Sequence, residues 1–172
     1  MADDTFRWML ARETPRLRRF ATALTGNADS ADDLVQDTLE RALRKKRLFR
    51  GTGSVRAWLF KLLYRVHLNQ RTRRQSETAA LSAVEQRTAG SADGGQEAHV
   101  EVLNIAVALR GLPDAQREAV LLVGLEGLAY DEAAAVLGIR VGTLKSRLFR
   151  GREALWAVRK GGAAASDETR LS

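Results

Sequence analysis

The sequence contains no cysteine, which excludes a disulfide framework and a thiolate metal site. Histidine is almost absent as well, because His67 and His99 are the only two and lie far apart in the chain. A zinc or iron site built on histidine is therefore not expected. We expect no metal and no cofactor. The lack of cysteine is consistent with a reducing compartment.

Long apolar runs are also missing. No stretch of the sequence is long and apolar enough to cross a bilayer. The first residues, MADDTFRW, are acidic and then mixed, and they lack the apolar segment of a secretion signal. We therefore expect a soluble, cytoplasmic protein with no membrane insertion.

Proline is scarce, with two residues in 172, and strict alternation of apolar and polar residues is rare. Apolar residues recur instead at helical spacing, as at Leu17, Phe20 and Leu24. This pattern predicts an all-α fold. Pro15 is expected to break or kink the helix that contains it. The sequence Thr25–Asn27, which includes a glycine, is expected to end that helix.

Two stretches of low apolar content divide the chain. Residues 76–99 are rich in alanine, serine, glycine and acidic residues, and they are predicted to form a flexible linker. Residues 161–172 are predicted to form a disordered tail. The remaining segments, 1–75 and 100–160, are each predicted to be a small helical domain. The expected organisation is two small helical domains joined by a flexible linker.

The net charge of +7 is distributed unevenly. Residues 1–75 carry 17 Lys and Arg against 8 Asp and Glu, whereas residues 76–99 carry 1 against 4. A basic excess confined to one part of a chain suggests a nucleic-acid surface there. An ordinary solvated surface is the alternative, because charge by itself does not distinguish the two.

The stretch DSADDLVQDTLERALRKK, residues 29–46, predicts a helix with two unlike faces. Asp29 or Ser30 is placed to cap its first turn. The expected buried stripe comprises Leu34, Val35, Leu39, Ala42 and Leu43. The outer face is polar and comprises Asp33, Gln36, Asp37 and Glu40. Such a face suits a basic partner; the alternative is that its acids serve only the helix dipole and solubility.

A glycine-bearing loop, FRGTGS at residues 49–54, precedes a second predicted helix at residues 55–75. Its expected core face comprises Trp58, Leu59, Leu62, Leu63 and Val66. Basic and amide side chains remain for solvent or a partner: Arg65, Asn69, Arg71, Arg73 and Arg74. Glycine in the loop can let a base approach the backbone. The loop lacks the pattern of a phosphate-binding Walker loop, so nucleotide binding is not expected there.

Two further helices are predicted near the C-terminus. YDEAAAVLG, residues 130–138, is a short helix ended by Gly138, and VGTLKSRLFRGREAL, residues 141–155, follows after a short turn. Helices joined in this way are typical of a helix-turn-helix. At 100° per residue, the buried stripe of the second helix comprises Val141, Leu144, Leu148 and Leu155.

The outer faces of that last helix have the residue types of a major-groove reader. Arg150 can bond two acceptors of a guanine, and Phe149 can contact a thymine methyl group, beside Ser146. Phosphates can be held by Lys145, Arg147 and Arg152 and by backbone N–H groups near Gly142 and Thr143. The alternative is an ordinary amphipathic helix whose Phe149 makes an intramolecular contact.

Taken together, these motifs resemble those of a known protein family. Residues 111–155, GLPDAQREAVLLVGLEGLAYDEAAAVLGIRVGTLKSRLFRGREAL, closely resemble region 4 of bacterial sigma-70 family factors of the extracytoplasmic-function (ECF) group. ADDLVQDTLERAL, residues 31–43, resembles region 2.2, and residues 49–74 resemble regions 2.3 and 2.4. The resemblance covers nearly the whole chain in the expected order. LLVGLEGLAYDEAA, residues 121–134, is similar to the general-stress branch of the group.

The resemblance implies a transcription initiation factor that binds core RNA polymerase and directs it to promoter DNA. It implies contacts with the β′ clamp helices and the β flap of the polymerase, and an anti-sigma factor as a regulator. By likeness, the clamp contact would be made by Asp33, Gln36, Asp37 and Glu40.

The same resemblance assigns DNA-binding residues. For the −10 element they are Gly51, Thr52, Ser54, Arg65, Asn69, Arg71, Arg73 and Arg74. For the −35 element they are Arg140, Thr143, Lys145, Ser146, Arg147, Phe149 and Arg150. Two positions depart from the family pattern. Many members carry asparagine at Arg65, which leaves open the base that is read, and proline is common at Arg140, where arginine can add a phosphate contact.

Two other classes of function were weighed against this one. A stand-alone helix-turn-helix regulator with an unrelated sensor domain is the alternative, and the first domain distinguishes the two because it has an acidic helix followed by a basic one. An enzyme is not expected. The sequence has no histidine–carboxylate constellation, no cysteine nucleophile and no lysine-bearing phosphate loop, so no catalytic residue is assigned.

Overall fold

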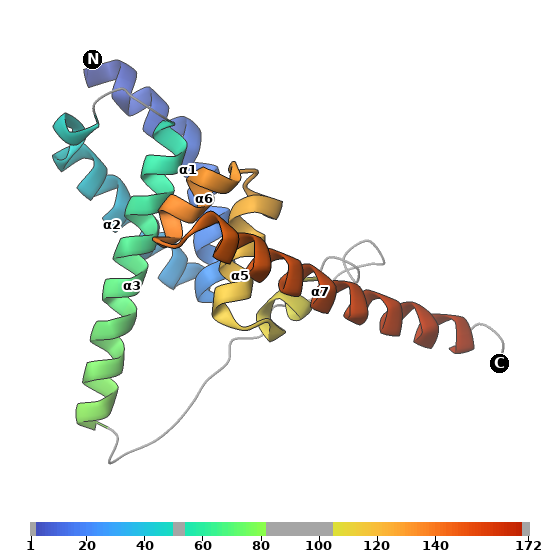
Figure 1. The fold of residues 1–172 in the computed structure, drawn as a ribbon. Helices are drawn as coiled ribbons and strands as arrows, with labels where there is room; N and C mark the ends of the chain where they lie inside the picture. The colour runs from blue at the N-terminus through green and yellow to red at the C-terminus, as the bar shows by residue number, and fades with distance from the viewer. Residues whose placement is uncertain (1–2, 50–53, 82–104, 170–172) are drawn as a thin grey trace. The chain divides into compact units, whose positions relative to one another are not determined.

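The computed structural model describes residues 3–49, 54–81 and 105–169 of the protein (Figure 1). Within these ranges the chain consists of helices and connecting turns, without a β-strand. The predicted all-α fold is therefore confirmed. The chain divides into two compact units, the first centred on α1, α2 and α3 and the second on α5 and α7.

Three helices build the first unit: α1 (Asp3–Thr25), α2 (Ala28–Arg44) and α3 (Val55–Leu81). A short 3-10 helix, η1 (Lys46–Leu48), follows α2. Each of the three α-helices contacts the other two, so their apolar faces enclose one core. The rings of Phe20 and Phe60 meet there edge to face, with centroids 5.1 Å apart. Other residues with fully buried side chains are Leu17, Leu34, Leu59, Leu63 and Val66.

The junction between α1 and α2 is capped from both sides. Gly26 has a φ of 69°, which glycine adopts without steric cost, and its N–H donates to the carbonyl of Thr22 at 2.8 Å. Asn27 then accepts a hydrogen bond from the N–H of Ser30 at 2.8 Å. The predicted end of α1 is confirmed. The predicted cap by Asp29 or Ser30 is wrong, because α2 begins at Ala28 and Asn27 occupies the cap position.

Pro15 lies inside α1, and the helix continues through it from Asp3 to Thr25. Of the two predicted effects of Pro15, the break is therefore wrong, and the kink stays a prediction. Proline removes one backbone donor, but the apolar face is buried on both sides of it, at Leu10 and at Leu17. Burial of that continuous face stabilises the helix in spite of the lost hydrogen bond.

The buried stripe of α2 differs from the predicted one at four positions, because Leu39 and Leu43 are not buried whereas Ala31 and Thr38 are. Leu43 was expected in the core, but 41% of its surface is exposed. Thr38 is buried instead, and its hydroxyl donates to the carbonyl of Leu34 at 2.7 Å, so no polar group is left unpaired. Helical spacing explains the difference, because one stripe comprises Ala31, Leu34, Val35, Thr38 and Ala42. Leu39 lies at its edge and is half-buried.

Two helices are longer than the sequence predicts. Helix α3 continues to Leu81, so the first six residues of the predicted flexible linker are helical, and the rest of that linker lies outside the described residues. Helix α7 (Val141–Thr169) includes most of the predicted disordered tail. Adding a residue to an existing helix needs no new nucleus, and alanines at residues 163–165 favour the helical state.

The described chain after α3 contains a helix at residues 105–111, α5 (Asp114–Val120), a π-helical turn η2 (Leu121–Leu125), α6 (Tyr130–Leu137) and α7. Helix α5 packs against α7. Arg117 holds the turn before α5, because its Nη2 donates to Asp114 Oδ1 at 2.6 Å and its Nη1 to the carbonyl of Leu112 at 3.4 Å. None of the helices within the described residues is long and apolar enough to span a membrane.

Candidate nucleic-acid and polymerase interfaces

A turn at residues 138–140 joins α6 to α7. Gly138 has a φ of 67°, and the N–H of Ile139 donates to the carbonyl of Ala134 at 3.0 Å, which closes the end of α6. The carbonyl of Arg140 accepts from the N–H of Leu144 at 3.0 Å, so Arg140 is the last residue before α7. The predicted order of helix, turn and helix is therefore confirmed, with the helix end at Gly138.

One side of α7 is buried as predicted at Leu144 and Leu148. Leu155 is half-buried. The expected burial of Val141 is wrong, because 37% of its surface is exposed. Side chains in a helix lean toward its N-terminus, and at the first residue of α7 this direction leads to the turn at residues 138–140, where Gly138 and Arg140 are exposed.

Gly151 of α7 lies in close contact with α5. A Cβ atom at this position would lie 2.7 Å from Cγ2 of Val120 and 3.4 Å from the backbone oxygen of Gln116. Only glycine allows the two backbones to come this close. The sequence analysis missed this residue, although a glycine inside an amphipathic helix is a signal of close packing. The contact holds α7 so that its opposite side remains open.

The outer face of α7 carries four of the residues expected to face DNA: Lys145, Ser146, Phe149 and Arg150. All four are exposed, and Phe149 exposes 63% of its surface. Phe149 is therefore not buried within the protein, and an ordinary amphipathic helix with a basic outer face stays the alternative to a DNA-contacting one. An aromatic ring presented among polar and cationic side chains has the chemistry of a base-contacting residue.

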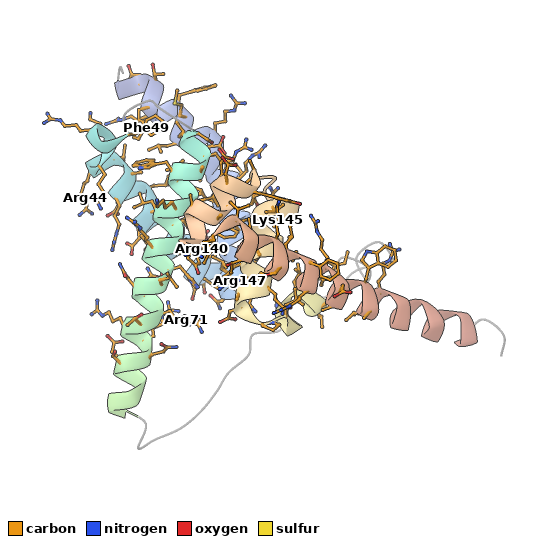
Figure 2. The ribbon with its side chains drawn as sticks, viewed as in Figure 1. Arg44, Phe49, Arg71, Arg140, Lys145 and Arg147 are labelled. Carbon is orange, nitrogen blue, oxygen red and sulfur yellow. The ribbon has the colours of Figure 1, made fainter. Side chains whose placement is uncertain are left out.

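The cationic side chains of this face remain available for a phosphate. Within residues 105–159, no ion pair involves Arg140, Lys145, Arg147 or Arg150, three of which are labelled in Figure 2. Lys145 Nζ lies 5.9 Å from the ring centroid of Tyr130, the first residue of α6. Ser146 donates its hydroxyl to the carbonyl of Thr143 at 3.0 Å, and the hydroxyl oxygen is still free to accept. Thr143 is exposed and Arg147 is half-buried.

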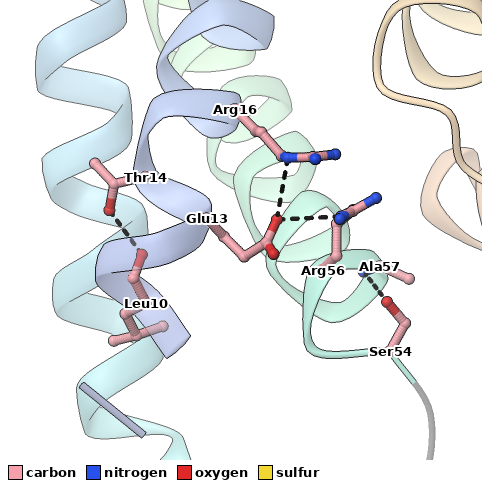
Figure 3. A network of polar contacts seen from close by, with 7 residues as sticks. All are labelled: Leu10, Glu13, Thr14, Arg16, Ser54, Arg56 and Ala57. Carbon is pink, nitrogen blue, oxygen red and sulfur yellow. Dashed lines mark hydrogen bonds and ion pairs between the residues drawn. The ribbon is translucent and has the colours of Figure 1, made fainter. Parts of the chain in front are cut away.

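A second basic surface lies along α3. The expected −10 residues of this helix are all exposed, namely Arg65, Asn69, Arg71, Arg73 and Arg74. Arg73 forms an ion pair with Glu77 at 3.0 Å, and because both side chains are largely exposed this pair is weak. Figure 2 labels Arg71 on α3. Ser54 caps α3 by accepting from the N–H of Ala57 at 3.2 Å (Figure 3), whereas Gly51 and Thr52 lie outside the described residues.

Three of the four polar residues on the outer face of α2 are exposed, and the fourth, Asp37, is held by a hydrogen bond from α3. Asp33 is exposed, Gln36 donates to Glu40 at 3.3 Å, and Glu40 pairs with Arg44 at 3.0 Å. Asp37 is half-buried and accepts from Nε2 of Gln70 on α3 at 3.0 Å. The four expected clamp residues therefore share a helix face, but Asp37 also joins α2 to α3. Gln70 is a residue that the sequence analysis missed, and no local pattern indicates it.

Among the described residues, no group of three or more histidine, aspartate or glutamate side chains is arranged to hold a metal ion. The exposed residues named above on α2, α3 and α7 are mainly charged or polar.

Two family models match the chain. The sigma2 domain of PhyR matches residues 10–64, and sigma-70 region 4 matches residues 103–155. The ECF RNA polymerase sigma factor EcfG of Rhodopseudomonas palustris (strain TIE-1) is 42% identical over 155 residues, which cover 90% of this chain and 85% of EcfG. The ECF RNA polymerase sigma factor SigC of Mycobacterium tuberculosis (strain CDC 1551 / Oshkosh) is 35% identical over 144 residues, 81% of this chain and 75% of SigC.

Solved structures agree with these matches. The sigma factor RpoE, in complex with the anti-sigma factor NepR from Bartonella quintana, is 35% identical with a TM-score of 0.81, covering 91% of this chain and 97% of RpoE. CnrH, in complex with the cytosolic domain of CnrY, is 26% identical with a TM-score of 0.69, covering 93% of this chain and 90% of CnrH. Taken with the exposed basic helices and the helix-turn-helix, these likenesses establish that the chain belongs to the ECF group of bacterial RNA polymerase sigma factors, which initiate transcription at promoters.

Proposed function

We propose that this sigma factor selects its promoters with two separate surfaces and binds the polymerase with a third. In this proposal residues 1–75 are region 2, residues 76–99 connect the regions, residues 100–160 are region 4 and residues 161–172 are a terminal extension. Two observations support the division: the matched family models fall on either side of residues 65–102, and the chain separates into two compact units.

The outer face of α7 carries the proposed −35 contact. Arg150 would bond a guanine edge, Phe149 would contact a thymine methyl group, and Ser146 would accept or donate at a neighbouring base. Phosphates would be held by Arg140, Thr143, Lys145 and Arg147. The observation that supports this proposal most directly is the exposure of Phe149, at 63% of its surface, beside the exposed Ser146 and Arg150.

The −10 element would be bound as single-stranded DNA by α3 and the loop that precedes it. Asn69 offers an amide to a base edge, and Arg71 and Arg74 would hold the backbone through charge. Gly51, Thr52 and Ser54 would complete this surface, with Arg65 and Arg73 at its edge. The exposure of the basic side chains of α3 supports this assignment.

The acidic face of α2 would contact the β′ clamp helices of core polymerase, because an exposed carboxylate and amide row is complementary to basic groups. Asp33, Gln36 and Glu40 are the exposed members, and Asp37 contributes from the edge of the α3 contact. Region 4 would bind the β flap. In this proposal the protein acts in the cytoplasm, and the polymerase supplies all catalytic residues.

An anti-sigma factor is proposed as the regulator. The sigma factor RpoE, which this chain resembles, was solved in complex with the anti-sigma factor NepR, and CnrH was solved in complex with the cytosolic domain of CnrY. The similarity to EcfG and to the sigma2 domain of PhyR supports a place near the general-stress branch. A stand-alone helix-turn-helix regulator is not favoured, because the relatives match across both units of the chain.

Transcription in vitro with core polymerase tests the proposal. The template is a library of linear DNA with a randomised region upstream of one common transcript, and sequencing of the transcribed templates gives the base preference at each position. We expect enriched sequences at two positions centred near −10 and −35. A protein that binds duplex DNA by itself, and gives no transcripts with core polymerase, would contradict the proposal.

A further inference from the structure

One aromatic ring of α6 lies beside the outer face of α7. Tyr130 is the first residue of α6, and Lys145 belongs to the second turn of α7, where it is labelled in Figure 2. The Nζ atom of Lys145 lies over the Tyr130 ring, 5.9 Å from its centroid. The face of an aromatic ring attracts a cation within about 6 Å of its centre. This contact therefore joins the proposed recognition helix to the helix before it.

The start of α6 holds Tyr130 in place. The backbone N–H of Ala129, the residue before the helix, donates to Oε2 of Glu132 at 3.2 Å. The carbonyl of Ala129 accepts from the N–H of Ala133 at 2.9 Å, and Ala133 is buried. A glutamate that bonds back to the N–H before a helix stabilises the first turn of that helix. A tyrosine has only two side-chain torsions, so its ring is ordered at a low cost in entropy.

The Lys145 side chain depends on this ring for its order. It is exposed, and within residues 105–159 no ion pair involves it. A lysine has a long, flexible stem, and few of its conformations present the ammonium group to one given point. Its neighbour Ser146 is held within α7, because its hydroxyl donates to the carbonyl of Thr143. The Tyr130 ring restrains Lys145 from another helix.

We propose that Tyr130 is a positioning residue for −35 binding, whose ring holds the ammonium group of Lys145 where it meets a DNA phosphate. This inference rests on the proposed −35 role of α7. An ammonium group has three donors, so one side can lie over the ring while another bonds a phosphate oxygen. Because the lysine is already restrained, less conformational entropy is lost when the phosphate binds. Phosphate contacts fix the register of a protein on a duplex, so the restraint also aligns α7 with the bases.

Binding of promoter DNA to the complex of the full chain with core polymerase tests this role. The probe is the duplex that the randomised-template assay enriches most, and its Kd is measured at several salt concentrations. Tyr130→Leu removes the ring, and we expect it to raise Kd by about two- to fivefold, the effect of losing an exposed contact between a cation and a ring. Tyr130→Phe keeps the ring and removes only the hydroxyl, so its Kd is expected to match that of the wild type.

A double-mutant cycle shows whether the ring acts through Lys145. Lys145→Ala is expected to raise Kd and to reduce the slope of its salt dependence by about one, as the loss of one phosphate contact does. Adding Tyr130→Leu to Lys145→Ala is then expected to raise Kd no further, because the ring has no lysine left to position. A purely structural role of Tyr130 would instead give the same loss with and without Lys145.

Leu121→Ala is the control for stability. Leu121 is buried in η2 and takes no part in the contact between Tyr130 and Lys145. Its truncation is expected to lower the melting temperature, and any loss of DNA binding that follows should be the same with and without Lys145. Tyr130 exposes 39% of its surface, so Tyr130→Leu is expected to leave the melting temperature close to that of the wild type.

The outcomes separate this inference from the function on which it rests. If Lys145→Ala leaves Kd and its salt dependence unchanged, the phosphate role of Lys145 fails and the inference fails with it. If Lys145→Ala weakens binding but Tyr130→Leu leaves it unchanged or tightens it, the inference alone is overturned. A loss for Tyr130→Phe equal to that for Tyr130→Leu would overturn it as well, because the hydroxyl would then be the active group. A Kd that Tyr130→Leu raises only while Lys145 is present supports it.

Discussion

Gln70 of α3 donates a hydrogen bond through Nε2 to Oδ2 of Asp37 on α2, at 3.0 Å. Asp37 is half-buried at this contact, whereas Asp33, one turn earlier on α2, is exposed. The polar face of α2 therefore has two parts that respond differently to substitution. A change at Asp33 alters only what a partner would meet, but a change at Asp37 also disturbs the packing of α2 on α3.

Asp33→Arg is expected to weaken binding to core polymerase. A positive charge placed against a basic clamp surface is repelled, and we expect an increase in Kd of at least about tenfold, or about 1.4 kcal/mol. The melting temperature should be unchanged, because the Asp33 side chain is exposed. Titration of labelled protein with core polymerase measures the effect, and an unchanged Kd would remove Asp33 from the proposed clamp contact.

Gln70→Ala is the complementary substitution. It removes the hydrogen bond to Asp37 while leaving the carboxylate in place, so we expect the free energy of unfolding to fall by about 0.5–1.5 kcal/mol. Binding to core polymerase is expected to be nearly that of the wild type. Urea unfolding measures the first quantity. Strongly reduced polymerase binding in a fully folded Gln70→Ala variant would show that Gln70 itself belongs to the interface.

Arg150→Ala is expected to lose the preference for one base pair of the −35 element. The cost should be about 1–3 kcal/mol at that position and small elsewhere, because a guanidinium that bonds a base edge is specific for it. The matched change is Arg152→Ala on the same helix, where a phosphate contact predicts a uniform loss across sequences. The randomised-template assay measures both, and a uniform loss for Arg150→Ala would reassign it to the phosphate backbone.

Phe149→Ala and Leu148→Ala should change different properties although the residues are neighbours. The first is expected to change base preference and the second the free energy of unfolding. Phe149 is exposed, so its loss is expected to leave the free energy of unfolding within about 0.5 kcal/mol of the wild type and to reduce the preference for thymine at one −35 position. Leu148 is buried, so its truncation is expected to cost about 2–5 kcal/mol. Thermal unfolding and template sequencing together check the pair. A large stability loss for Phe149→Ala would mean that the ring packs within the protein.

Gly151→Ala is expected to destabilise the second unit. The added methyl group would meet Cγ2 of Val120 at 2.7 Å, and this branched side chain cannot move away freely. Overpacking of this kind costs about 1–3 kcal/mol, which outweighs the gain of about 0.5–1 kcal/mol from helix propensity.

Gly142→Ala is the control for this substitution, because no atom lies within 4 Å of its added Cβ. It is expected to raise the free energy of unfolding by about 0.5–1 kcal/mol, since alanine favours the helix over glycine. Urea unfolding distinguishes the two variants. A stabilised Gly151→Ala protein would show that α5 and α7 separate easily at this point.

Much of the local structure follows from residue spacing. The helical repeat in α7 predicted that Leu144 and Leu148 are buried and that Lys145, Ser146, Phe149 and Arg150 face outward, and the structure confirms each of these. Gly138 predicted the end of α6 correctly because a left-handed residue after a helix favours glycine. The errors in predicted burial lie at the edges of the apolar stripes, at Leu43 and Val141. Burial there depends on how far the neighbouring helix extends.

The candidate sites were predictable as helix faces but not as contacts. The polar row of α2 and the basic row of α3 are visible in the sequence because each repeats with the helix. The contacts that join these two faces are not visible in the sequence. Asp37 and Gln70 are 33 residues apart and meet only when α2 packs on α3. The contacts of Phe6 with Phe49 and of Glu13 with Arg56 have the same origin, because they join α1 to residues far along the chain.

The sequence by itself determined the all-α fold, the helix-turn-helix and the family, because helical periodicity, glycine at a helix end and motif order are properties of neighbouring residues. Tertiary structure decided which of those residues are free to act. It left Leu43 exposed and buried Thr38, brought Asp37 into contact with Gln70, and set Gly151 against Val120. The physical reason is that exposure, hydrogen bonding and steric contact depend on distances between helices, and no local pattern encodes them.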